Sequence, residues 1–377
     1  MKVWCTVSKW AAGAVISLLA IWIVTALFTN NIRLDEWSEA LDQNVLTTGT
    51  VIRERKEGWA ASHVGEFGLI GSRSEEVAAS PKVLIWGDSF VEAFHVADSE
   101  KMHRQLNELL QGKDGPGGSA IAVGKRLSSV ADYVFKIPEY ESVLPEVKLH
   151  VIHFHSLEDT FPDEYPGARI SLFLSKPSLH LERYDDEFRN KAAPAKPSTV
   201  RKAIYRYNLH FFSNLAKQLA QIVRLEGMRF APGVSQPPAE REIHRRLDRF
   251  FHDDWVKTEP PTEAWRFLLR ELEAVTDVPI LFAYAPPMPT LVKGRSVLEN
   301  PEKDLVAHFA EICREEGFGF VNFEGPFLRF YETTGRFPKG FHNTRPWEGH
   351  FNADGHRLAA GAIFDWIEQN RHVVYPD

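Results

Sequence analysis

The chain has 377 residues, of which 44% are hydrophobic and 25% are charged, and its formal net charge is −7 at pH 7. This composition is typical of a globular protein long enough for one large domain or two, and the acidic balance argues against a nucleic-acid-binding surface. Cys5 and Cys313 have no zinc-type spacing and are not expected to form a disulfide. The sequence predicts no resident metal or cofactor.

The amino-terminal stretch from Trp10 to Phe28 contains no charged residue. At a rise of about 1.5 Å per residue it can cross most of a ~30 Å hydrocarbon core. Lys2 and Lys9 precede it and acidic residues follow, which predicts a cytoplasmic amino terminus and an exported remainder. A cleaved signal peptide ending at Val24-Thr25-Ala26 is the alternative. The length of the run favours an uncleaved transmembrane anchor over residues 1–30, and a buried core helix is the third interpretation.

A rhythm of strands and helices follows this stretch. Residues 31–80 are polar and broken by glycines, and are expected to form a juxtamembrane lead-in that lies against the domain. Residues 81–160 and 261–377 alternate short apolar runs with helical patterns, which predicts a parallel sheet covered by helices on both faces. The fold class is therefore three-layer α/β/α with about five strands. The expected strands are Val83–Ile85, Ser119–Val123, Val147–Phe154, Val278–Tyr284 and Phe318–Phe323.

The rhythm breaks over residues 161–260, which we interpret as a mostly helical insertion at the edge of the sheet. Pro162–Pro197 is rich in proline and charge and is expected to be irregular. Thr199–Leu225 has an amphipathic helical pattern. Arginines occur among apolar residues in Ala239–Trp255, and a solvated helix face is favoured there over an anion site.

The first strand runs directly into Gly87-Asp88-Ser89. A serine in a sharp turn after a strand can present its hydroxyl at the carboxyl edge of the sheet, although an ordinary turn explains the tripeptide equally well. Asp88 is expected to shape this turn. A serine nucleophile needs a base and an acid that orients the base. His350, in a loop before the last helix, is the candidate base, and Glu348 is the candidate acid.

The pattern Gly87-Asp88-Ser89-Phe90, followed near the carboxyl terminus by His350-Phe351-Asn352-Ala353-Asp354-Gly355-His356, resembles the SGNH (GDSL) hydrolase family. The resemblance implies that Ser89 is the nucleophile and His350 the general base. It also implies an oxyanion hole made by the Ser89 amide, a glycine after the second strand and an asparagine after the third. Gly124 fits the glycine position, whereas Glu158-Asp159 stands where the family has Asn-Asp. A carboxylate cannot donate a hydrogen bond unless it is protonated.

The resemblance further implies a bacterial, single-pass inner-membrane protein with a periplasmic esterase or O-acyltransferase domain. Its expected partners are an acylated, in particular acetylated, envelope polysaccharide and the membrane, and protein partners are left open. One alternative is a catalytically impaired domain that binds glycan or serves as a scaffold. Another is a metal-dependent hydrolase using His153, His155 and Glu158, although packing of these histidines between sheet and helices is the preferred interpretation.

Overall fold

The computed structural model describes residues 2–113, 115–126, 128–144, 146–160, 168–172, 179–183, 197–209 and 262–376. The chain divides into two compact units. One comprises Met1–Ile32 and Ser198–Pro261, and the other comprises Arg33–Pro197 and Thr262–Asp377.

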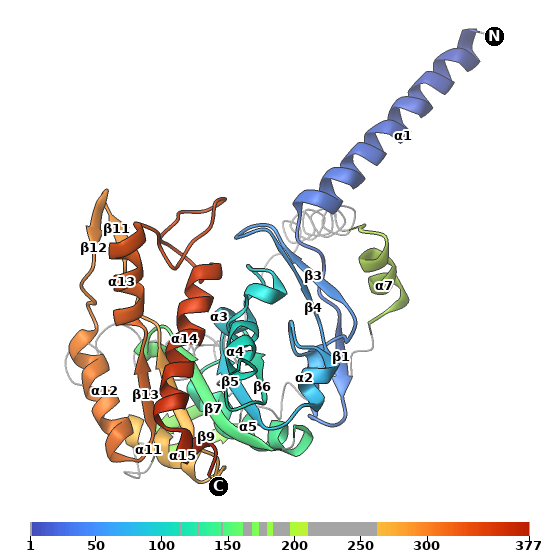
Figure 1. Ribbon diagram of the computed structural model, residues 1–377. Helices are drawn as coiled ribbons and strands as arrows, with labels where there is room; N and C mark the ends of the chain where they lie inside the picture. Colours follow the sequence, from blue (N-terminus) through green and yellow to red (C-terminus); the bar gives the residue numbers. More distant parts are fainter. Residues whose placement is uncertain are drawn as a thin grey trace, which may run out of the picture. The chain divides into compact units, whose positions relative to one another are not determined.

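The first unit contains helix α1 (Lys2–Phe28) and helix α7 (Thr199–Arg206) (Figure 1). Within α1, Val7–Phe28 has a mean hydropathy of 2.3, and 6% of its most apolar window is buried. A core helix would be mostly buried. Among the described residues, α1 is the one helix long and apolar enough to span a membrane, and a signal sequence has the same length and composition.

The second unit is built on a five-stranded parallel sheet with the strand order β13-β10-β7-β5-β6. Each run that the sequence marked as a strand forms one, so the predicted three-layer α/β/α architecture is confirmed. The strands are β5 (Lys82–Gly87), β6 (Ser119–Gly124), β7 (Val147–Phe154), β10 (Ile280–Tyr284) and β13 (Gly319–Asn322).

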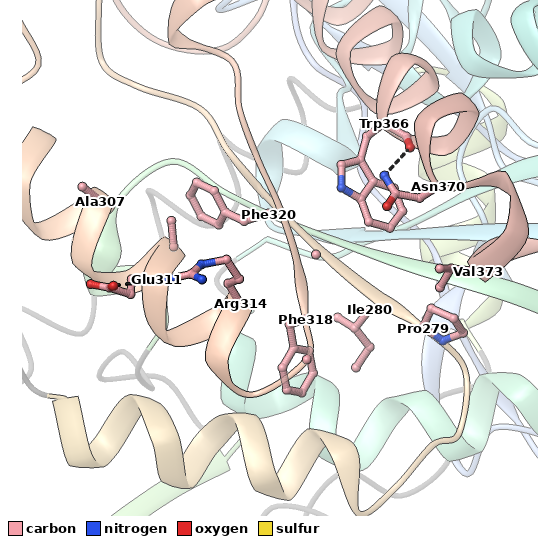
Figure 2. A pocket seen from close by; sticks show the side chains of 13 residues that line it. Pro279, Ile280, Ala307, Glu311, Arg314, Phe318, Phe320, Trp366, Asn370 and Val373 are labelled. Carbon is pink, nitrogen blue, oxygen red and sulfur yellow. Dashed lines mark hydrogen bonds and ion pairs between the residues drawn. The ribbon is translucent and has the colours of Figure 1, made fainter.

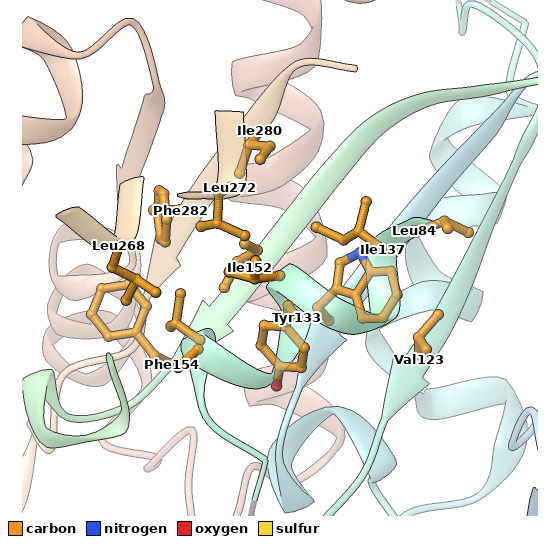
Figure 3. Packing of buried hydrophobic residues seen from close by; sticks show 14 of the residues in the cluster. Leu84, Val123, Tyr133, Ile137, Ile152, Phe154, Leu268, Leu272, Ile280 and Phe282 are labelled. Carbon is orange, nitrogen blue, oxygen red and sulfur yellow. The ribbon is translucent and has the colours of Figure 1, made fainter. Parts of the chain in front are cut away.

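Alternate residues of the strands enter two separate cores, one on each face of the sheet. In β5, Leu84 and Trp86 lie in the first core, whereas Val83 and Ile85 lie in the second. Helices α5 (Val130–Val143), α11 (Thr262–Glu273) and α12 (Lys303–Glu315) close the first core. Figure 3 shows this core, in which Tyr133 and Ile137 of α5 face Leu84 and Ile152. Helices α4 (Met102–Leu110), α13 (Glu324–Thr334) and α14 (Ala353–Gln369) close the second.

The segment before the sheet belongs to the same unit and forms two antiparallel hairpins. They are β1 (Asp35–Ser38) with β2 (Gln43–Leu46), and β3 (Val51–Glu54) with β4 (Ala60–His63). Ile52 of β3 and Val64, directly after β4, pack on Phe94, which lies two residues beyond α3. This contact brings the β3–β4 turn to the carboxyl edge of the sheet.

The remaining described elements are short. They are η1 (Glu66–Gly68), α2 (Ser74–Ala78), α3 (Ser89–Glu92), η2 (Asp98–Glu100), η3 (Leu157–Thr160), the hairpin β11 (Thr290–Val292) with β12 (Arg295–Val297), and α15 (Arg371–Val374).

The expected insertion is described only in part. Strands β8 (Ala168–Leu172) and β9 (Leu179–Arg183) pair antiparallel, where an irregular segment was expected. Helix α7 begins at Thr199, as the amphipathic pattern predicts. The rest of that predicted helix and the arginine-containing stretch Ala239–Trp255 lie outside the described residues.

Candidate active site

Ser89 is the first residue of a one-turn helix at the carboxyl end of β5. Asp88 caps this helix, because its Oδ1 accepts a hydrogen bond from the amide of Phe90 at 2.9 Å. Gly87 permits the sharp turn, since a Cβ there would lie 2.4 Å from Cγ2 of Val91. The helix ends at Glu92, and Ala93 after it adopts a left-handed conformation with φ of 50°. The turn therefore presents the Ser89 hydroxyl at the edge of the sheet.

His350 meets this hydroxyl from the loop before α14. Its Nε2 lies 2.8 Å from Oγ of Ser89, although 261 positions separate the two residues in sequence. The ring of Phe90 contacts the imidazole with a centroid distance of 4.9 Å. The structure thus brings together the two residues that the sequence singled out as nucleophile and base.

The acid that orients His350 is Glu57, in the turn between β3 and β4. Its Oε2 lies 2.8 Å from Nδ1 of His350, and its Oε1 accepts the backbone amide of His350 at 2.7 Å. Burial raises the pKa of Glu57, but the hydrogen bonds from His350 outweigh burial and leave this pKa below its ordinary value. The ionised carboxylate holds the proton on Nδ1, which leaves Nε2 free to accept the Ser89 proton.

The prediction that Glu348 orients His350 is wrong. Oε1 of Glu348 lies 2.9 Å from the guanidinium of Arg345, and its side chain is 52% exposed. Glycine at position 349 is what lets the loop turn toward Glu57 instead. Gly349 has φ of 82°, and a Cβ there would lie 2.1 Å from Oε1 of Glu57. Asn343 also joins the two segments, since its Nδ2 donates to the carbonyl of Gly58 at 2.9 Å.

The residues that the family resemblance places in an oxyanion hole have different structural surroundings. Gly124 ends β6 beside Gly87, and a Cβ there would lie 2.2 Å from the amide nitrogen of Glu92, so α3 approaches this strand closely. Oδ2 of Asp159 accepts the amides of His155 and Ser156 at 3.1 and 3.0 Å. The Asp159 carboxylate therefore shapes the turn after β7 and does not serve as a donor. Glu158 lies in η3, and its side chain is outside the described residues.

His155 forms a charged cluster beside the Ser89 turn. Its Nδ1 lies 2.8 Å from Asp159 and 3.6 Å from Asp88. Burial lowers the pKa of His155, but Asp159 more than compensates and leaves it above its ordinary value. Burial raises the pKa of Asp88, and the neighbouring His155 moderates this increase. The imidazole also stacks on Phe90, with a centroid distance of 4.7 Å, and so supports the nucleophile turn.

His153, another member of the hypothetical metal site, is enclosed by aromatic rings. Its ring lies 5.5 Å from Phe351 and 5.7 Å from Phe90 between centroids, and neither ring nitrogen has a hydrogen-bond partner among the described residues. Burial lowers the pKa of His153 to about 3. These contacts match the interpretation of His153 as a packed, neutral residue.

Because His153 is buried in its neutral form, the folded protein is predicted to lose stability as the pH falls. The pKa of His153 is about 3 in the folded protein against 6.5 ordinarily, so the unfolded chain binds more protons as pH falls from 6.5 toward 3. His153 should therefore remove about 1.4 kcal/mol of stability per pH unit in that window. In urea unfolding at pH 7, 6, 5 and 4, the free energy of unfolding of His153→Phe is expected to fall less steeply with decreasing pH than that of wild type. His372→Phe, at an exposed position, should keep the wild-type slope, and an unchanged slope in His153→Phe would contradict the assignment.

The described side chains offer one cluster that could hold a metal ion, formed by Glu57, His95 and His350, whose ligand atoms lie within 4.8 Å of one another. The His95 and His350 rings are stacked, with centroids 3.9 Å apart and planes 16° from parallel. Because imidazole nitrogens bind metals in the plane of the ring, one ion cannot lie in both planes. A metal would require one ring to turn, so this arrangement fits a hydrogen-bonded base better than a metal centre.

A hollow of about 600 Å³ lies away from this site, at the start of β10 and β13 (Figure 2). Ile280, Phe318 and Phe320 line it together with Trp366 of α14 and Asn370, which directly follows that helix. Neither Ser89 nor His350 contributes to this hollow, because it is at the amino end of the strands.

No protein-family model matches the sequence, and comparison with curated proteins finds no match. Among solved structures, an acetyl-xylooligosaccharide esterase mutant from Geobacillus stearothermophilus is similar, with a TM-score of 0.36 and 12% identity over 78% of this chain and 96% of that one. The protein YxiM from Bacillus subtilis has a TM-score of 0.35 and 9% identity, over 87% of this chain and 68% of that one.

Proposed function

We propose that this protein is a serine esterase or O-acyltransferase of the SGNH type. The observation that carries the proposal is the continuous chain of hydrogen bonds from Ser89 through His350 to Glu57, with both distances at the imidazole equal to 2.8 Å. A nucleophile, a base and an orienting acid in this arrangement are what acyl transfer requires. The sequence motifs around Ser89 and His350 independently resemble the same family.

In the proposed reaction, Oγ of Ser89 attacks the carbonyl carbon of an ester while Nε2 of His350 accepts the hydroxyl proton. Glu57 stabilises the imidazolium that forms. His350 then donates the proton to the departing alcohol oxygen, and the acyl group stays on Ser89. Water, or a sugar hydroxyl in the transferase case, loses its proton to His350 and attacks the carbonyl carbon of this acyl-enzyme. The bond from that carbon to Oγ of Ser89 breaks, and His350 returns the proton to Oγ.

The developing oxyanion needs hydrogen-bond donors, each of which can contribute about 3 kcal/mol. We assign this role to the backbone amides of Ser89 and Gly124. Gly124 ends β6, and Ser89 begins the helix that follows the adjacent strand β5. Asp159 is excluded from this set because its carboxylate accepts backbone amides. In this proposal, the two backbone donors serve without an asparagine side chain.

We further propose that the substrate is an acylated, in particular acetylated, polysaccharide of the cell envelope. This step rests on the family resemblance of the sequence. The apolar α1 supports anchoring of the protein in the bacterial inner membrane, with the globular unit on the periplasmic side. A catalytically impaired glycan-binding protein is the competing hypothesis, and it predicts no covalent chemistry at Ser89.

The test uses the full chain purified in detergent. A fluorophosphonate probe should label it, and mass spectrometry of the digest should place the adduct on Ser89. The protein should also release acetate from an acetylated polysaccharide, with chelators having no effect. Acetylation of an added oligosaccharide would identify transfer to a sugar hydroxyl. Absence of both labelling and turnover of an aryl acetate would overturn the proposal, and loss of activity on chelation would favour a metal-dependent hydrolase.

A further inference from the structure

We propose that His95 is a positioning residue that fixes the plane of the His350 imidazole, an inference that rests on the proposed function. His95 lies just beyond the short helix that begins with Ser89, and its ring stacks on that of His350. Two histidines thus accompany one carboxylate, and they have different roles.

The His350 imidazole can turn about its Cβ–Cγ bond, which tilts the plane of the ring. Its contacts with Glu57 and Ser89 are at Nδ1 and Nε2, on opposite sides of the imidazole ring. A small turn about Cβ–Cγ bends both hydrogen bonds without breaking either, so they oppose this rotation only weakly. If the ring rotates, the Nε2 lone pair leaves the direction of the Ser89 hydroxyl. A flat neighbour on the face of the ring is what restrains this rotation.

His95 supplies that neighbour. Its ring centroid lies 3.9 Å from that of His350, and the planes differ by 16°. Phe90 also contacts His350, at 4.9 Å and with a 43° tilt, so it is the less parallel of the two neighbours. The His95 side chain is 7% exposed and therefore has little freedom to move away.

The backbone around His95 is held in place on both sides. Ala93, with φ of 50°, turns the chain back after α3, and Phe94 is fully buried. The carbonyl oxygen of His95 lies against Gly58, where a Cβ would approach to 2.1 Å. Because Gly58 directly follows Glu57, the same contact sets the position of the carboxylate and of the stacking ring.

Stacking explains the position of His95 better than hydrogen bonding does. Its Nε2 lies 3.7 Å from Oε2 of Glu57, which is too long for a hydrogen bond. Burial, together with the nearby His350, lowers the pKa of His95 to about 4. His95 is therefore neutral at pH 7 and adds no positive charge beside His350 when that ring accepts the serine proton. A neutral flat ring of similar size should be able to replace it.

The test compares His95→Phe, which keeps a flat ring, with His95→Leu and His95→Gln, which do not. In the full-length protein, His95→Leu and His95→Gln should lower kcat for an aryl acetate by about 10- to 100-fold with KM unchanged, the cost of a misaligned base. His95→Phe should stay within about 3-fold of wild type. His342→Leu, at an exposed position in the His350 loop, should have no effect. Circular dichroism melting should verify that each variant is folded.

Two outcomes would overturn the role of His95. Activity in His95→Leu equal to wild type would show that the plane of His350 needs no support. Rescue by His95→Gln but not by His95→Phe would show that a polar contact matters instead. Crystal structures of His95→Phe and His95→Leu decide the question even if the proposed function fails. The His350 ring should keep its plane in the first variant and rotate, or occupy several orientations, in the second.

Discussion

Replacing Ser89 by alanine is expected to lower kcat/KM for an aryl acetate by a factor on the order of 10⁴–10⁶. The substitution removes the only atom that can form the acyl-enzyme in the proposed mechanism. It leaves the oxyanion donors and the substrate-binding surface in place, and these alone give a small residual rate. Because the Ser89 side chain is only partly buried, the melting temperature should stay close to that of the wild type.

Ser99→Ala is the matched control, since Ser99 lies in η2 ten positions along the chain and is exposed. It should keep full activity. If Ser89→Ala retained a tenth or more of the wild-type rate, the nucleophile would not be Ser89. A residual activity that chelators then abolish would point to a metal-bound water.

The fold was predictable because its signals are local. Each strand of the central sheet is a short apolar run bounded by turn-forming residues, and helical patterns separate them. Parallel strands joined by helices leave few alternative arrangements. The antiparallel pairing of β8 and β9 was missed because the surrounding prolines and charges suggested irregular structure. Residues far apart in sequence supply no such local signal.

The candidate site shows the same division. Ser89 and His350 lie in recognisable motifs, each next to an element that the sequence predicts. Glu57 lies in no recognisable motif. It is 293 positions from His350, in a turn between short strands. With 51 acidic residues in the chain, proximity in sequence favoured Glu348, two residues before the histidine. The nearest signal is Gly58, whose left-handed φ of 70° marks a tight turn directly after Glu57.

Replacing Glu57 by glutamine is expected to lower kcat/KM by about 10³- to 10⁴-fold. The reason is that the carboxylate accepts hydrogen bonds from two donors of His350. Oε1 accepts the backbone amide of His350, and Oε2 accepts Nδ1–H. A backbone amide can only donate, so the single oxygen of glutamine must face it. The glutamine NH₂ group then faces Nδ1, which must accept, and the ring proton moves to Nε2. That tautomer cannot take the proton of Ser89.

Glu348→Gln is the matched control, because it makes the same chemical change in the acid that the sequence favoured. Its exposed ion pair with Arg345 contributes little, so activity and stability should both remain near wild type. The pair of variants separates two accounts of the site. A large loss of kcat/KM in Glu57→Gln alone means that the catalytic acid comes from the β3–β4 turn, far from His350 in sequence. A large loss in Glu348→Gln alone would mean that the His350 loop adopts a different arrangement when substrate is bound.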